Sequence, residues 1–207
     1  MIAAFILCFF VFVIWLRIYL SRTYRKEAKA TESFWSRESK ANSTRKRSTG
    51  SIAYIKIPLD NLPVLENPSE TIATHQEHIK ELSNLEIANF SDKTNTDLKL
   101  EYGAPNLDYL TQLDQNYSDL LKTLYEWGND LYSENLVTEA TSVLEYGISL
   151  KTDIIKHYTL LAEIYKSENA IRKIETLLTF ADSLNCLTAS AIKRSLNEIL
   201  QSCRSPE

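Results

Sequence analysis

The hydrophobic positions of this 207-residue chain follow two different patterns. Residues 1–16 carry no charged side chain, and Arg17 is followed by three more apolar or aromatic residues. A helix of twenty residues rises about 30 Å, which is the thickness of the hydrocarbon core of a bilayer. After residue 66, apolar residues instead recur at spacings of three and four, which is typical of amphipathic helices. The two patterns predict an all-α protein with a single transmembrane helix over residues 1–20.

Three other interpretations of the first segment fit it less well. A cleaved secretory signal has basic residues before its apolar core, whereas here they follow it. A bacterial lipoprotein signal has a small residue before the modified cysteine, whereas Leu7 precedes Cys8. A buried core helix is disfavoured because the segment has no polar face. A spanning helix is therefore the leading interpretation.

Charge divides the chain into two parts. Residues 1–50 contain ten basic and three acidic side chains, and residues 51–207 contain 13 basic and 24 acidic ones. Basic residues flank the cytoplasmic end of a spanning helix, so we expect a single-pass protein of the cell membrane with its C-terminal part in the cytoplasm. The acidic balance of that part argues against nucleic acid as a partner.

The segments between the first helix and the repetitive part differ in composition. Residues 21–51 are rich in Ser, Thr and Lys without periodicity, which predicts a disordered basic juxtamembrane linker. Residues 52–66 combine β-branched residues with two prolines, which predicts an extended strap docked on the helical body. Residues 67–104 hold the N-terminal helices, at about 69–85 and 96–102.

Residues 105–207 are helical by pattern and contain an internal repeat. The apolar face of one predicted helix recurs in the next unit, and the tripeptide Ser133–Asn135 recurs unchanged as Ser167–Asn169. The repeats span about 121–154 and 155–188, and a capping helix is expected at 189–202. The recurring positions are Leu124, Trp127, Gly128, Leu131, Ala140, Leu144 and Gly147 in the first unit, and Tyr158, Leu161, Ala162, Tyr165, Leu178 and Ala181 in the second.

These positions resemble the tetratricopeptide repeat, whose period is about 34 residues and whose pattern runs Trp-x-x-Leu-Gly-x-x-Tyr, then Ala-x-x-x-Phe, then Pro. The resemblance implies antiparallel helix pairs and places Gly128 where the paired helix crosses closely. The chain departs from the pattern at Ile174, which stands at a position that is usually alanine, and neither unit has the closing proline. Asn135 and Asn169 replace the turn glycine, which asparagine tolerates because it accepts the left-handed conformation.

The resemblance also implies a partner-binding groove lined by the first helix of each repeat. Asn129 matches a position that peptide-binding members use to hold a peptide, but Tyr125 replaces their lysine one turn earlier, so a carboxylate clamp is not predicted. The groove positions are Lys122, Tyr125, Glu126, Asn129 and Tyr132 in the first unit, and Lys156, Thr159, Leu160, Glu163 and Lys166 in the second.

No pattern of catalytic or cofactor-binding residues stands out. His75 and His78 share a helix face but lack the His-Glu-x-x-His spacing and a third ligand, and His157 is isolated in sequence. Four glycines form no phosphate-binding loop, and no serine lies in a nucleophile elbow. We therefore expect no enzyme activity, no cofactor and no metal.

Together these features predict a membrane-tethered adaptor or scaffold that binds a protein or peptide partner through a cytoplasmic repeat domain. It resembles small membrane-anchored repeat proteins of bacteria. One alternative is a structural membrane protein in which the short array completes its core by forming a homo-oligomer. Another is an extracytoplasmic envelope binding protein, with the first segment inverted or cleaved.

Overall fold

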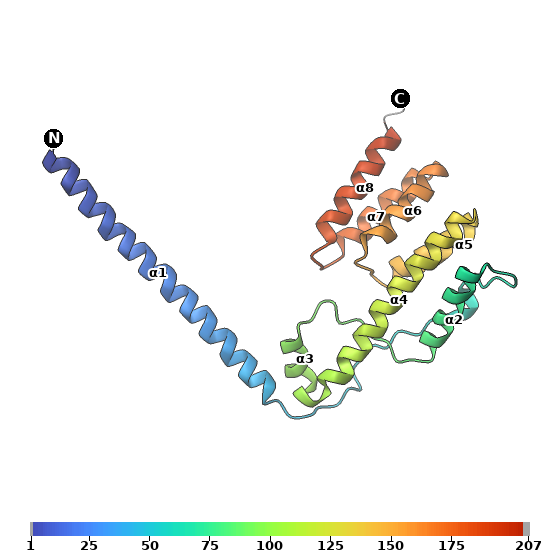
Figure 1. Ribbon diagram of the computed structural model, residues 1–207, viewed down its shortest axis with the longest axis horizontal. Coiled ribbons are helices and arrows are strands. Elements are labelled where there is room, and N and C mark those ends of the chain that lie inside the picture. The colour runs from blue at the N-terminus through green and yellow to red at the C-terminus, as the bar shows by residue number, and fades with distance from the viewer. Residues whose placement is uncertain (1, 205–207) are drawn as a thin grey trace. The chain divides into compact units, whose positions relative to one another are not determined.

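The computed structural model describes residues 2–204, with the side chains of residues 12–203 (Figure 1). Its described residues form eight α-helices, two short 3-10 helices and one isolated β-bridge between Tyr54 and Ala88, with no strand. The expected all-α class is confirmed. The chain forms two compact units, Met1–Thr49 with Asn95–Leu107, and Gly50–Thr94 with Asp108–Glu207.

The first unit is dominated by α1 (Ile2–Asn42), a helix of 41 residues. Within the part of the chain that the structure describes, no helix combines the length and apolar character needed to cross a membrane. The predicted spanning segment 1–20 overlaps residues 1–11, whose side chains lie outside the described part.

The expected disorder of the basic segment 21–51 is wrong over most of its length. The helix α1 continues to Asn42, because Arg, Lys, Glu and Ala are good helix formers and no glycine or proline occurs between Leu20 and Gly50. Lys99 of α3 (Asn95–Tyr102) donates hydrogen bonds to Glu38 at 2.6 Å and to Asn42 at 2.7 Å. The hydrogen bond from Lys99 lowers the pKa of the Glu38 carboxyl group.

The residues that follow α1 are also held in place. The backbone N–H of Arg47 donates to Tyr102 O at 2.9 Å, and the N–H of Ala104 donates to Thr44 O at 3.1 Å. Gly103 makes this approach possible, since its φ is 92° and a Cβ atom there would overlap the carbonyl oxygen of Arg45. The basic segment is therefore clamped to α3 by its backbone while its charged side chains stay exposed.

The second unit begins with residues 52–66, which are extended apart from a 3-10 turn at Leu59–Asn61, in agreement with the predicted strap. Next, α2 (Glu70–Ser83) starts at its N-cap Ser69, whose hydroxyl accepts from Ile72 N, and packs beside α4 (Figure 1). A Ser cap followed by apolar residues at helical spacing explains why the sequence located this helix within two residues.

The remaining helices repeat with the predicted period. In order they are α4 (Leu107–Ser133), α5 (Val137–Ser149), α6 (Ile155–Ser167), α7 (Ile171–Asp182) and α8 (Ala189–Arg204). Both α4 and α6 end at a serine, and the starts of α5 and α7 are separated by one full period. Asn135 and Asn169 have φ values of 62° and 58°, which confirms the left-handed turns.

Small residues let the helices of the second unit approach closely. A Cβ atom on Gly128 of α4 would lie 2.8 Å from Leu144 Cγ on α5, and one on Gly147 of α5 would lie 2.5 Å from His157 Nε2 on α6. Leu124 and Trp127 of α4 are fully buried in the same core. The recurring apolar positions of the sequence therefore form the interior of this unit.

Candidate partner-binding face

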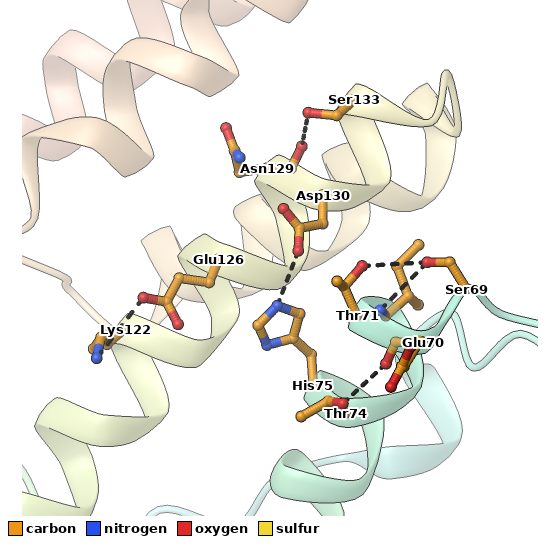
Figure 2. A network of polar contacts seen from close by, with 11 residues as sticks. Ser69, Glu70, Thr71, Thr74, His75, Lys122, Glu126, Asn129, Asp130 and Ser133 are labelled. Atoms are coloured by element: carbon orange, nitrogen blue, oxygen red, sulfur yellow. Dashed lines mark hydrogen bonds and ion pairs between the residues drawn. The ribbon is translucent and has the colours of Figure 1, made fainter.

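Asn129 is the most informative of the predicted groove residues. It lies on α4 one position before Asp130, which points toward His75 of α2, while the Asn129 side chain points away from α2 (Figure 2). The residue is half-buried and its side-chain amide makes no hydrogen bond within the described part of the chain, although its backbone oxygen accepts from Ser133 Oγ at 2.8 Å. An amide has two donors and an acceptor, so Asn129 can bind both polar groups of a peptide bond.

The charged groove residues pair within their own helices. Lys122 and Glu126 of α4 are 3.8 Å apart, and Lys166 and Glu163 of α6 are 3.9 Å apart. Pairs of this kind on a solvated helix contribute only about 0.2–0.5 kcal/mol, so both can exchange partners at little cost. Neither ion pair connects α4 to α6.

Tyr125 connects the two predicted sets of groove residues. Its ring meets His157 of α6 edge-on, with centroids 5.7 Å apart, and Lys156 Nζ lies 5.8 Å from the centre of the same ring. Tyr125 and Tyr132 are both half-buried against the core, so part of each side chain remains accessible. An accessible tyrosine anchored by packing presents a large contact area that loses little entropy on binding.

His157 is a structural residue that sequence reasoning did not single out. It is fully buried, and its Nδ1 lies 3.3 Å from Thr152 Oγ1, while Nε2 is buried against Gly147 without a hydrogen-bond partner in the described residues. Burial lowers the pKa of His157 to about 4. The available signal was its helical spacing from the apolar residues Ile154 and Leu161, with a small residue ten positions earlier.

The other two histidines dock α2 on α4. His75 Nε2 lies 3.1 Å from Asp130 Oδ2, and His78 Nε2 lies 3.0 Å from Asp119 Oδ2 (Figure 2 draws the first pair). The two imidazoles thus face carboxylates that lie three turns apart on α4. Within the described residues, no group of three or more His, Cys, Asp and Glu side chains is arranged to hold a metal ion.

The strap borders two pockets that the predicted groove residues do not line. The two pockets along residues 54–68 are lined by strap residues, parts of α2 and Trp127, and neither includes Tyr125, Asn129 or Tyr132. Instead, Leu62 of the strap is buried in the core. The strap therefore packs against α2 and the core of the second unit.

A hollow between α6 and α8 extends the face beyond the predicted residues. It has a volume of about 410 Å³ and includes the predicted residues Thr159 and Glu163. The additional lining residues come from α8 and are Ser195, Glu198, Ile199 and Ser202. Sequence reasoning assigned α8 only a capping role, because its positions carry no repeat signature.

Comparison with protein-family models, curated proteins and solved structures gives no match. The function of the face is therefore inferred from its own residues.

Proposed function

We propose that this chain is a membrane-tethered adaptor that binds a protein or peptide partner along the face formed by α4, α6 and α8. The observation that carries the proposal is the half-buried residue Asn129, whose side-chain amide has no hydrogen-bond partner in the described residues and lies on the same helix as Tyr125 and Tyr132. Such an amide can both donate to and accept from the backbone of a bound partner.

The recurrence of the helices supports a tetratricopeptide-like array. The pairs α4–α5 and α6–α7 follow one another with the period of the sequence repeat, and left-handed asparagines close the turn in both. Stacked helix pairs create extended surfaces suited to a peptide or a partner helix. In this chain α8 follows as the last helix and contributes Glu198 to the hollow beside α6.

The tether is assigned to the N-terminal part of α1. Residues 1–16 have no charged side chain, and the ten basic residues among the first fifty support a cytoplasmic location for the following domain. Tethering confines the domain to the membrane surface and raises its effective concentration toward membrane-bound partners. A weak interaction surface is then sufficient for function.

Site-directed photocrosslinking in cells tests the proposed face. A benzophenone amino acid replaces Tyr132 in the full chain, which keeps Asn129, and a matched control replaces Ser142, which is exposed on α5. We expect a discrete crosslinked product at position 132 that is absent at position 142. Crosslinking of the same product at equal yield from both positions contradicts the assigned face.

A substitution series distinguishes recognition from folding. Asn129→Ala removes only an amide that makes no hydrogen bond within the described chain, so we expect its circular dichroism and thermal unfolding to match those of the wild type. Its crosslinking through a benzophenone at Tyr132 should fall by about tenfold, because one good hydrogen-bonded contact contributes about that much to affinity. Unchanged crosslinking from Tyr132 in this variant means that Asn129 has no role in recognition.

A further inference from the structure

A pocket of about 300 Å³ lies between α5, α6 and α7, and none of the predicted groove residues lines it. The buried part of its apolar lining consists of Ile148 of α5, Leu161 of α6 and Leu177 of α7. Phe180 of α7 also lines the pocket and is 45% exposed, so it lies where the pocket meets solvent. The volume is at the lower end of the range for small-ligand sites, which leaves room for one small apolar group.

Both charged residues of the lining, Glu145 of α5 and Lys173 of α7, contact the same tyrosine. The hydroxyl of Tyr165 donates to Glu145 Oε1 at 2.5 Å, and Lys173 Nζ lies 4.7 Å from the centre of the Tyr165 ring. Burial and the hydrogen bond to Glu145 raise the pKa of Tyr165, so its hydroxyl remains a donor at neutral pH. Two opposite charges are therefore held beside one aromatic side chain in the lining of the pocket.

These two charges remain available to a ligand. Glu145 and Lys173 are both exposed, and neither forms an ion pair with another of the described residues. The hydrogen bond from Tyr165 occupies only part of the acceptor capacity of the carboxylate, which has two oxygens. The contact with the ring leaves the three N–H donors of Lys173 free to bind an anionic group.

The signs of the two charges restrict the chemistry of the ligand. A fatty acid could pair with Lys173, but its carboxylate would be repelled by Glu145, and for an alkylamine the two roles are reversed. An α-amino acid carries an ammonium group and a carboxylate on one carbon, so it can form a charge-assisted hydrogen bond with each residue. Its side chain then extends into the apolar lining.

We propose that this pocket binds a free α-amino acid with an apolar side chain, whose ammonium group pairs with Glu145 and whose carboxylate pairs with Lys173. Such a ligand connects α5 with α7, which are the second helices of consecutive repeats, so its binding also stabilises their packing. The site is independent of the proposed partner-binding face, because neither charged residue belongs to the predicted groove.

Fluorine-19 NMR of the full chain in lipid nanodiscs tests the site through Phe180. Incorporation of 4-fluorophenylalanine labels all seven phenylalanines, and the Phe180 signal is assigned by its disappearance in Phe180→Tyr. With L-leucine as the probe, we expect a saturable shift of this signal with a Kd of about 1 mM, the order expected for a ligand of this size. The signal of Phe34 on α1, assigned in the same way, should not move.

Three related compounds make the result specific. L-leucinamide lacks the carboxylate, N-acetyl-L-leucine lacks the ammonium group and glycine lacks the side chain, so each should bind at least about fivefold more weakly than L-leucine. Glu145→Gln should weaken L-leucine about fivefold, but it should strengthen N-acetyl-L-leucine because the repelling carboxylate is gone. Lys173→Gln should likewise weaken L-leucine and strengthen L-leucinamide.

Two further substitutions serve as controls. Arg172→Gln removes a charge from α7 at an exposed position outside the pocket, and Asn129→Ala alters the proposed partner-binding face. Both variants should bind L-leucine like the wild type. Conversely, Glu145→Gln should leave crosslinking from Tyr132 unchanged, so a failure of either proposal leaves the other standing.

Three results overturn the inference. The first is the absence of a saturable Phe180 shift with L-leucine at concentrations up to about 20 mM, well above the expected Kd. The second is an equal Kd for L-leucine and either L-leucinamide or N-acetyl-L-leucine, which means that the charges do not select the ligand. The third is an unchanged Kd for L-leucine in both Glu145→Gln and Lys173→Gln.

Discussion

Gly128 of α4 lies directly against Leu144 of α5, so that a Cβ atom on Gly128 would stand 2.8 Å from both Cγ and Cδ2 of the leucine. Leu144 is fully buried, and the overlap would involve its branch point as well as a methyl group. The glycine therefore permits the crossing of two helices at a position where any other residue displaces the core. An interior glycine costs a helix about 1 kcal/mol relative to alanine, which close packing here offsets.

This contact predicts that the effect of Gly128→Ala changes sign with the residue at position 144. In the wild type the new methyl group overlaps Leu144, and we expect a loss of about 1–2 kcal/mol in the free energy of unfolding. In a Leu144→Ala background, itself destabilised by about 2–5 kcal/mol, the overlap is gone and the higher helix propensity of alanine should gain about 1 kcal/mol. Urea unfolding of the four chains by circular dichroism measures the cycle.

Gly128→Leu provides the stronger version of the same test. Its side chain has no space in this core, so we expect the second unit to unfold while the proposed membrane tether is unaffected. Additive effects of Gly128→Ala and Leu144→Ala, or a stable Gly128→Leu variant, would contradict the observed crossing.

His157 predicts a pH dependence of stability. The folded protein holds this imidazole with a pKa of about 4, whereas an unfolded chain has the ordinary value of 6.5. Between these pH values the unfolded state binds more protons, so the stability is complete above pH 6.5 and falls as the pH decreases toward 4. The difference in pKa corresponds to about 3 kcal/mol once both states are protonated.

The measurement compares the wild type with His157→Gln, which keeps a buried polar side chain but does not titrate. Other titrating groups cancel in the difference between the two unfolding free energies. We expect this difference to change by about 1.4 kcal/mol per pH unit between about pH 6 and 4.5. A flat difference across this window means that the folded imidazole accepts a proton as readily as the unfolded one.

The sequence predicts those parts of the fold that depend on residues close together in the chain, and it misses those that depend on contacts between distant residues. Helix positions and the turn asparagines follow from local spacing, so Asn135 and Asn169 were placed correctly by the period of the repeat. The clamp between α1 and α3 joins residues that are 53–61 positions apart, such as Glu38 and Lys99. A single sequence contains no signal for that pairing, and the polar composition of the segment indicated disorder instead.

In the candidate partner-binding face, too, the sequence does not reveal contacts between distant residues. The period identifies Gly147 as a small position but does not reveal that His157 fills the space beside it. Asn129 is predicted as a groove residue from its place in the repeat, whereas the position of Glu198 beside α6 depends on how α8 packs. Likewise, the pocket that Trp127 and Gln76 both line depends on the docking of α2, which is set by contacts across 41 and 55 residues.

The positive φ of Lys151 predicts that replacing this residue with glycine stabilises the fold. It follows α5 with a φ of 62°, a conformation that costs a residue with a Cβ atom about 1–2 kcal/mol. Lys151→Gly removes this cost but adds entropy to the unfolded chain, so the net gain should be about 0.5–1 kcal/mol. Lys151→Ala is the matched control, because it removes the same charge and keeps the Cβ atom. Equal stability of the two variants in thermal unfolding would show that the backbone conformation carries no strain.

The close approach of the chain at Gly103 predicts that residues 45–47 are protected from cleavage by trypsin. Trypsin cleaves after Arg45, Lys46 and Arg47, whose side chains are exposed but whose backbone is clamped to α3. Gly103→Ala places a Cβ atom on the carbonyl oxygen of Arg45 and forces alanine into a φ of 92°, so the clamp should open. Because cleavage follows the population of the open segment, a cost of about 1–3 kcal/mol should speed it by about tenfold or more.

Cleavage after Lys166 and Lys173 in α6 and α7 serves as the internal control. These sites belong to the other compact unit, so their rate should be the same in the wild type and in Gly103→Ala. Faster cleavage at all sites would indicate general unfolding, and unchanged cleavage at residues 45–47 would mean that the clamp does not depend on Gly103. A selective increase at residues 45–47 shows that the junction between α1 and α3 opens as a separate local unit, because local unfolding has its own free energy in each part of a protein.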